Sequence, residues 1–215
     1  MGANRHVDGS RYPLGADLPP HIVTAHDLVT TLAYRRDLLD RVSARCREVF
    51  DYGLAITLAP EQQVSLVATS PERRLSVTGM GSGFVQLTWV LVMLELAAME
   101  RDGGRPITPV IGIEEPELHR HPALQPQVAR VLAHFLGAGL QVVCTTQSEH
   151  LLVAILTLVL SGQLEPGQVA ISYLSEGRAE RLEVNGRGQV TGGLRGFFEA
   201  NEDELKRYLE LLSRR

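Results

Sequence analysis

The chain has 215 residues, of which 44% are hydrophobic and 21% are charged, as expected for a globular domain large enough to bury a core. Its formal net charge of −4 argues against a protein that coats DNA, because phosphate binding needs concentrated positive charge. The two cysteines, Cys46 and Cys144, lie far apart without metal-binding spacing, and the N-terminus has no signal-peptide pattern. We therefore expect a cytoplasmic protein in a reducing compartment.

The first third of the chain predicts a tail, a helix and three short strands. Residues 1–20 carry Gly, Pro, Asn and Asp without periodicity, and we expect a flexible tail there. Apolar residues recur at helical spacing over 26–50, with arginines on the other face. The stretches 54–58, 64–69 and 75–78 look like strands separated by turn residues.

The remainder predicts alternating strands and helices. A glycine loop precedes an apolar helix over 84–100, which we expect to be buried because it is apolar all round. This run and 151–160 are too short or too interrupted to span a bilayer, so we expect no membrane contact. The later elements are strand 108–113, helix 122–136, strand 140–145, helix 149–160, a β pair at 169–174 and 180–184, and a helix from residue 201. This order predicts an α/β fold with a parallel sheet covered by helices.

The most informative segment is the apolar strand that runs into Glu114 and Glu115 and is stopped by Pro116. Buried parallel strands are continuous apolar runs, and ligands gather at their carboxyl ends. Two carboxylates there suit a bound Mg²⁺ and an activated water. Adjacent residues on an extended strand point to opposite faces, so we expect Glu114 to hold the metal and Glu115 to reach the attacking water. The alternative is a solvated strand end.

The glycine loop Gly81-Ser82-Gly83 opens the apolar helix. Its backbone N–H groups and the helix N-terminus could bind an anion, and Gln86, one turn into the helix, could add an amide donor. A structural turn is the alternative for a loop of this length.

Polar residues also follow the second buried strand, at 145–148. They would lie beside the acidic pair if the two strands are neighbours. Ser148 is also suited to cap the helix that starts at Glu149. His119 and His121 form an H-x-H pair, which invites a zinc interpretation, although no third ligand follows at a fixed spacing. The alternative is that both histidines dock the turn between strand and helix.

Taken in order, these motifs resemble the C-terminal half of ABC-type ATPase domains of the AAA family, in the branch related to SMC, RecF and the overcoming-lysogenization-defect ATPases. Residues 79–86 resemble the signature motif, and 110–115 resemble Walker B with its catalytic glutamate. Residues 116–122 resemble the P-E-x-H-x-H-P segment that follows, and 145–152 resemble the switch region. The resemblance covers about 75–212.

The resemblance implies a fold and a set of roles. Residues 21–215 would form a P-loop-type half-domain with helices on a parallel sheet and a small C-terminal β pair plus helix. Glu114 would coordinate Mg²⁺ and Glu115 would polarise water. The loop 81–83 would touch the γ-phosphate of a nucleotide held by an opposing subunit.

The sequence departs from the family pattern in three ways. It contains no G-x-x-x-x-G-K-[ST], the Walker A loop that cradles phosphates, and its single lysine is Lys206. Glu114 stands where the family usually has Asp. Gln147 stands where the switch histidine is expected; it can donate a hydrogen bond but cannot carry a proton charge.

These observations favour a split ATPase that binds ATP and Mg²⁺ only when a partner supplies Walker A. That partner would be another polypeptide or a second copy in a homodimer, and nucleic acid would be reached only through such a complex. The catalytic residues would be Glu115 and Gln147. The alternative is a non-catalytic interaction module that acts through self-association. A metal-dependent hydrolase that uses His119 and His121 is a more distant third reading.

Overall fold

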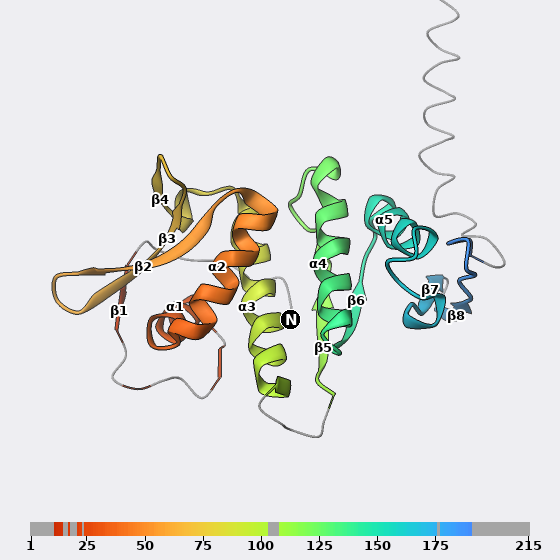
Figure 1. The fold of residues 1–215 in the computed structure, drawn as a ribbon, viewed down its shortest axis with the longest axis horizontal. Helices are drawn as coiled ribbons and strands as arrows, with labels where there is room; N and C mark the ends of the chain where they lie inside the picture. The colour runs from red at the N-terminus through yellow and green to blue at the C-terminus, as the bar shows by residue number, and fades with distance from the viewer. Residues whose placement is uncertain are drawn as a thin grey trace, which may run out of the picture. The chain divides into compact units, whose positions relative to one another are not determined.

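A computed structural model describes residues 11–14, 17, 21–22, 24–102, 108–175 and 177–190 (Figure 1). The chain divides into two compact units, one that ends at Thr146 and one that begins at Gln147. Each unit is described by itself. The helix expected from residue 201 lies outside the described residues.

The first unit begins with an antiparallel sheet. Strands β2 (Gly53–Ala59) and β3 (Gln63–Thr69) form a hairpin paired along its whole length, and Glu61 and Gln62 in its turn adopt φ of 64° and 57°. β4 (Arg74–Ser76) and β1 (Tyr12–Pro13) also pair with β3, and β1 lies in the stretch expected to be a tail. The three predicted strands are confirmed, and the hairpin turns between them explain why the pairing is antiparallel.

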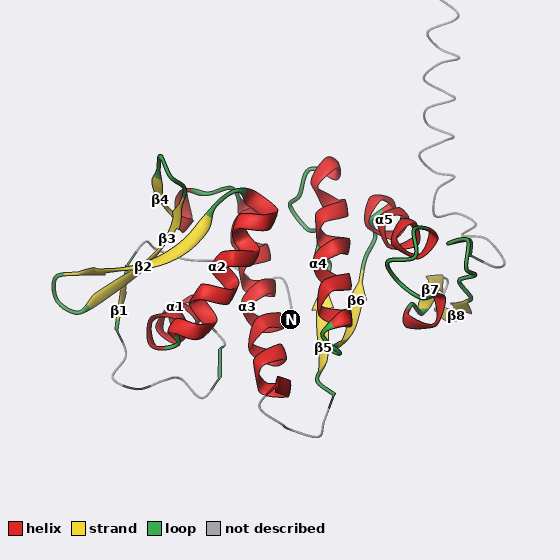
Figure 2. Cartoon of the chain, in the orientation of Figure 1, coloured by secondary structure: helices red, strands yellow, loops and turns green. Residues whose placement is uncertain are grey.

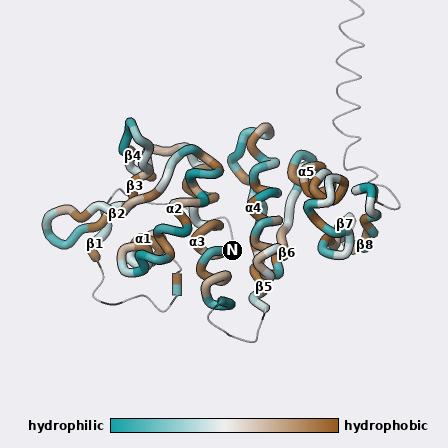
Figure 3. The backbone as a smooth tube through the Cα atoms, viewed as in Figure 1, coloured by the Kyte–Doolittle hydropathy of each residue, from teal (hydrophilic) through white to brown (hydrophobic). Residues whose placement is uncertain are grey.

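Two helices, not the one predicted, precede this sheet. α1 (Ala25–Tyr34) begins with a capping box between Thr24 and Asp27. α2 (Arg36–Phe50) starts after Arg35, whose φ of −101° and ψ of 81° lie outside the helical region. The apolar periodicity continues on both sides of Arg35, so the pattern predicts a single helix. In Figure 3 apolar and polar residues alternate along α2, as expected of a helix with one buried face.

The long helix α3 (Ser82–Asp102) follows a 3₁₀ turn at Val77–Gly79. Its 21 residues make it long and apolar enough to cross a membrane by length and composition, which corrects the expectation that this run is too short. This is weak support for a membrane span, because most of the apolar stretch is packed inside the unit, including Leu87, Leu91 and Leu94. We therefore assign α3 to the core.

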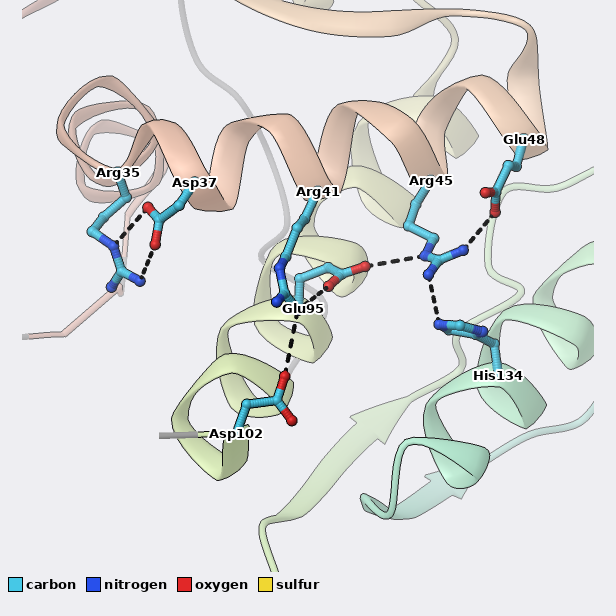
Figure 4. Close-up of polar contacts among 8 residues, drawn as sticks. All are labelled: Arg35, Asp37, Arg41, Arg45, Glu48, Glu95, Asp102 and His134. Atoms are coloured by element: carbon cyan, nitrogen blue, oxygen red, sulfur yellow. Dashed lines mark hydrogen bonds and ion pairs between the residues drawn. The ribbon is translucent and has the colours of Figure 1, made fainter. Parts of the chain in front are cut away.

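A polar network joins α2, α3 and the helix α4 (Gln125–Gly137) (Figure 4). Glu95 on α3 is only 4% exposed, and its Oε1 accepts a hydrogen bond from Arg45 Nε at 3.1 Å. Arg41 approaches both Glu95 and Asp102, at 3.9 and 3.7 Å. Arg45 Nη2 lies 2.7 Å from His134 Nε2, and because arginine only donates, that nitrogen is the acceptor. The buried carboxylate is thus paired, as a buried charge must be.

The second sheet of the first unit is parallel. β5 (Val110–Glu114) pairs with β6 (Gln141–Thr145). The chain between the two strands contains the 3₁₀ turn Pro122–Leu124 and the helix α4 (Gln125–Gly137). Figure 2 shows α4 running beside both strands. This strand–helix–strand unit confirms the predicted α/β class, although the parallel sheet has only these two strands within the described residues.

One face of the parallel sheet is open among the described residues. Ile113 is 3% exposed, whereas Val110 is 61% and Val143 is 56% exposed. The exposed positions alternate along both strands and pair in register: Val110 with Gln141, Gly112 with Val143, and Glu114 with Thr145. The apolar run correctly predicted a buried strand interior but could not show which face is covered.

The second unit contains α5 (Glu149–Leu160), the 3₁₀ turn Pro166–Gln168, and the antiparallel strands β7 (Ile171–Ser175) and β8 (Arg178–Leu182). Ser148 caps α5, since its side chain accepts a hydrogen bond from the Leu151 N–H. The predicted cap, helix and C-terminal β pair are therefore confirmed.

Candidate active site

The acidic pair lies where the sequence placed it, at the carboxyl end of a parallel strand. Glu114 is the last residue of β5 and is exposed. Its partner in the register is Thr145, the last residue of β6, which is also exposed. A carboxylate and a hydroxyl therefore leave the sheet side by side at its open face.

Glu115 does not continue the strand, as the alternation argument assumed. Its φ is 42°, a left-handed conformation that costs a residue with a side chain about 1 kcal/mol or more. The Glu115 N–H donates to the Thr145 carbonyl at 2.9 Å, which holds the turn against β6. This turn, and not the alternation of side chains along a strand, therefore sets the direction of the Glu115 side chain.

The loop after the acidic pair is buried and tied to the end of β6. Glu117 is 6% exposed, and its Oε1 accepts a hydrogen bond from the Thr146 hydroxyl. Its Oε2 has no hydrogen-bond partner among the described residues. The pKa of the Cys144 thiol is raised by burial and by the neighbouring Glu117. Both effects favour the protonated thiol, which is a poor nucleophile.

Arg120 connects this acidic loop to the glycine loop. Its Nη2 donates to the Gly83 carbonyl at 2.7 Å, and its guanidinium carbon lies 5.1 Å from the centre of the Phe50 ring. A Cβ on Gly83 would lie 3.0 Å from the His119 carbonyl oxygen, so a side chain there would crowd the backbone. The third glycine-loop residue is therefore packed directly against the segment that follows Glu115.

The burial of Arg120 is unusual for a charged residue. It is 7% exposed, and no carboxylate of the described residues pairs with it. Desolvation lowers the pKa of its guanidinium to about 10, which still leaves it charged at neutral pH. Sequence reasoning missed Arg120, because an arginine between two histidines in a turn looks like a solvated residue. The buried, charged contact is visible only in three dimensions.

The remaining glycine-loop residues lie at the start of α3. Gly81 and Ser82 are exposed, and the Gly81 carbonyl accepts hydrogen bonds from the N–H groups of Phe84 and Val85 at 2.9 and 3.4 Å. Gln86 is only 9% exposed, and its Oε1 has no hydrogen-bond partner in the described part of the chain. The loop thus presents two accessible residues at a helix N-terminus and one buried amide behind them.

The other predicted residues are Gln147 and the two histidines. Gln147 is exposed and is the first residue of the second unit, so its position belongs to that unit. His121 Nδ1 accepts a hydrogen bond from the Ala123 N–H at 3.3 Å, while His119 is exposed at φ 60°. Among the described residues no three His, Cys, Asp or Glu side chains form a metal-binding group. The histidines therefore shape the turn, and the zinc interpretation receives no support.

Comparison with known proteins decides the family. The sequence profile of the AAA ATPase domain matches residues 28–152, more than half of the chain. The chain belongs to this family. It is therefore an ATPase-type nucleotide-binding domain, and the resemblance drawn from its motifs is confirmed at that level. No curated protein matches the chain.

Three solved structures with similar folds are all SMC ATPases. One, from work on ATP-driven dimerization and DNA-stimulated activation of SMC ATPases, is 10% identical with a TM-score of 0.49, and the match covers 72% of this chain and 87% of that one. The Smc head domain of Pyrococcus yayanosii with coiled coil and joint is 11% identical with a TM-score of 0.48, covering 74% and 29%. The Pyrococcus furiosus Smc head bound to the C-terminal domain of ScpA is 11% identical with a TM-score of 0.47, covering 86% and 39%. These values are too low to carry functional weight, so the family assignment rests on the profile match.

The residues of this AAA ATPase domain fit part of a nucleotide site. Magnesium prefers oxygen ligands and keeps several waters, and the exposed Glu114 carboxylate beside the Thr145 hydroxyl suits such an ion. The 215-residue sequence contains no Walker A loop, and that loop supplies most contacts to the β- and γ-phosphates. At this edge of the sheet the sequence therefore offers oxygen ligands that suit a metal ion, and it contains no Walker A motif.

Proposed function

We propose that these residues form the Walker B and signature half of an ATP-hydrolysing ABC-type ATPase, completed by a lobe outside the sequence that carries Walker A. The observation that carries the proposal is the packing of the acidic strand end against the signature glycine. Arg120, five residues after Glu115, donates to Gly83, so the catalytic carboxylates and the phosphate-sensing loop form one connected unit. A solvated strand end with acids by chance would have no such connection.

Each residue has a distinct role in this proposal. Glu114 holds the magnesium ion, which when bound neutralises charge on the phosphates. Glu115, on its turn beside β6, accepts a proton from the attacking water. Gly81, Ser82 and Gly83 donate backbone N–H groups to phosphate oxygens at the N-terminus of α3. Gln147 stands at the switch position and orients the water by hydrogen bonding, since an amide cannot take up the proton.

The open face of the parallel sheet is where we place the missing lobe. Val110 and Val143 are more than half exposed on this face, and Glu114 ends it. A lobe that docks here covers the two valines and brings its phosphate-binding loop to the same edge as Glu114. A second copy of this chain could cover the valines but would bring no Walker A loop. We therefore assign the face to a lobe that bears Walker A.

The test is to purify the chain from its native host and examine what accompanies it. The proposal expects a polypeptide, or a flanking segment of the same one, that contains G-x-x-x-x-G-K-[ST], and an assembly that hydrolyses Mg-ATP. Glu115→Gln should bind nucleotide but slow turnover by about 10²–10⁴-fold, the usual loss when a general base is removed. Glu180→Gln, an exposed carboxylate on β8, is the matched control and should leave the rate unchanged.

Two results would contradict the proposal. One is an assembly in which Glu115→Gln hydrolyses ATP at the parental rate. The other is a co-purified complex that contains only copies of this chain and no Walker A sequence, which would instead favour the non-catalytic interaction module.

A further inference from the structure

One side of α5 in the second unit is apolar and uncovered. Except for its first two residues and Thr157, this helix is apolar throughout. Its buried residues share one side of the helix at helical spacing: Leu151, Leu152, Leu158 and Val159. On the opposite side Val153 is 48% exposed and Leu160 is 63% exposed. A helix that is apolar all round is normally buried, so this side is expected to have a partner.

The uncovered side forms a stripe, which we define as Val153, Leu156 and Leu160, all at least partly exposed. These residues are at positions i, i+3 and i+7, so they follow the helix axis over about 10 Å. Thr157 lies beside the middle of the stripe, and its hydroxyl donates a hydrogen bond to the Val153 carbonyl at 2.7 Å. This hydroxyl is therefore satisfied within the helix, and the stripe remains an apolar surface.

The last described segment of the chain lies against this stripe (Figure 1). A Cβ at Gly188 would collide with the Leu156 carbonyl oxygen and would lie 3.3 Å from the Leu160 Cβ. Gly188 adopts a φ of 64°, and a β-bridge between Val184 and Val190 closes the turn around it. The chain therefore leaves the described fold at Val190, beside the C-terminal half of α5.

The sequence that follows contains an apolar pattern that matches the stripe. Within the helix predicted from residue 201, positions i, i+3, i+4 and i+7 are apolar or aromatic: Leu205, Tyr208, Leu209 and Leu212. Most positions between them carry charge. This pattern extends over about 10 Å of helix, the same length as the stripe. The connecting residues 191–200 reach up to about 33 Å when extended, which is more than the full length of α5. The segment can therefore lie on the stripe in either direction.

The size of the stripe favours an attached segment over a second copy of the chain. One side of a helix of 12 residues is about 18 Å long and about 10 Å wide, or about 180 Å². A stable interface between two proteins buries about 800 Å² on each partner. A segment of the same chain needs much less contact, because the connection holds it at an effective concentration in the millimolar range.

We propose that residues 201–212 form an amphipathic helix that docks on the stripe of α5. Docking buries Leu205, Leu209 and Leu212 against the stripe, while the charged residues of the segment stay in water. The second unit then covers both sides of its apolar helix with its own chain. The inference goes beyond the proposed ATPase and does not depend on it.

The experiment forms disulfides in the full chain with Cys144→Ser, in which the remaining Cys46 is fully buried. Thr157→Cys lies beside the middle of the stripe and Tyr208→Cys near the middle of the apolar pattern, so the two meet in either direction of docking. This pair should oxidise to an intramolecular disulfide at least about ten-fold faster than Thr157→Cys/Arg207→Cys, because a disulfide needs Cα atoms within about 7 Å. Arg207 is the matched control, since it neighbours Tyr208 in sequence but lies away from the apolar side of the predicted helix.

A labelling measurement distinguishes this occupant of the stripe from others. Maleimide should label Thr157→Cys slowly, and Leu209→Gln should speed the labelling at least about ten-fold because it removes apolar contact, whereas Arg207→Gln should not. The proposal is wrong if both cysteine pairs oxidise at the same rate, or if the disulfide joins two chains on a non-reducing gel, which would assign the stripe to a second copy. A labelling rate that Leu209→Gln leaves unchanged also contradicts it, because the stripe is then open or covered by another part of the chain. No nucleotide or partner lobe is needed, so failure here leaves the proposed ATPase untouched.

Discussion

The two sheets of the first unit differ in how their apolar residues are buried. The antiparallel sheet is built from hairpins, and alternate residues of its central strand β3, namely Val64, Leu66 and Ala68, are almost fully buried, although Leu58 of β2 is 75% exposed. The parallel sheet buries Ile113 on one face and leaves Val110 and Val143 exposed on the other. The strands of a hairpin are adjacent in sequence, whereas parallel strands are joined by a long crossover connection, so a parallel sheet combines segments that are distant in sequence. The parallel sheet is also the one that carries the acidic pair, and its exposed face is where we propose that a Walker A lobe docks.

The largest expected effect contrasts the two faces of the parallel sheet. Ile113→Lys places an unpaired charge in the covered face and should reduce the free energy of unfolding by about 3–5 kcal/mol. Val143→Lys, on the neighbouring strand, puts the same side chain on the open face and should change it by less than about 0.5 kcal/mol. Urea denaturation followed by circular dichroism measures both. Equal losses would show that the open face is covered within the chain itself.

The second prediction concerns the completed region. Glu95→Ala removes the buried carboxylate that pairs with Arg45 and Arg41 and should cost about 3 kcal/mol, because the half-buried Arg45 is left without this partner. Glu48→Ala removes the other carboxylate on Arg45, whose side chain is 60% exposed, and should cost less than about 1 kcal/mol. Comparable costs in thermal denaturation would mean that the network in Figure 4 does not stabilise the core.

The third prediction tests the junction between the completed region and the acidic loop. Alanine for glycine normally stabilises a helix, yet Gly83→Ala should destabilise by about 1–2 kcal/mol because the new Cβ meets the His119 carbonyl and Arg120. Gly81→Ala is the matched control, since no atom lies within 4 Å of its Cβ position. A Gly83→Ala protein as stable as the parent would show that the two loops are not in contact.

The smallest expected effect on stability comes from Arg120→Met. Burial lowers the pKa of the Arg120 guanidinium from its ordinary value to about 10, so below pH 10 burial of the charge costs about 3 kcal/mol relative to the unfolded state. This cost is relieved only as the pH rises above about 10, toward the higher pKa of the unfolded state. Arg120→Met removes this cost, but it also removes the charged hydrogen bond to Gly83 and the contact with Phe50, which stabilise the fold by a similar amount. Chemical denaturation at pH 7 should therefore show a change of less than about 1 kcal/mol.

Arg120→Met should nevertheless slow ATP turnover in the completed assembly, because the acidic loop loses its connection to the signature glycine. Arg120→Lys keeps the charge but not the planar donor and should recover only part of the rate. If Arg120→Met hydrolyses ATP as the parent does, the arginine contributes nothing to the site.

Local patterns predicted much of this fold. The β2–β3 hairpin and the Ser148 cap depend on residues close in sequence, so alternation and capping rules located them. The break between α1 and α2 at Arg35 was not predicted, because the apolar periodicity is the same on both sides of it. The turn at Glu115 was not predicted, because glutamate rarely adopts a positive φ. The buried Arg120 depends on a contact 37 residues away in sequence, which no local pattern contains.

We propose that these residues provide the metal and water half of an ATP site but not the triphosphate half. Calorimetric titration of Mg-ATP into the isolated chain tests it most directly. We expect no binding in the micromolar range, because the loop and lysine that hold the β- and γ-phosphates are absent from the sequence. A micromolar dissociation constant that is lost in Glu114→Ala would contradict the claim, since the chain would then hold the triphosphate by itself.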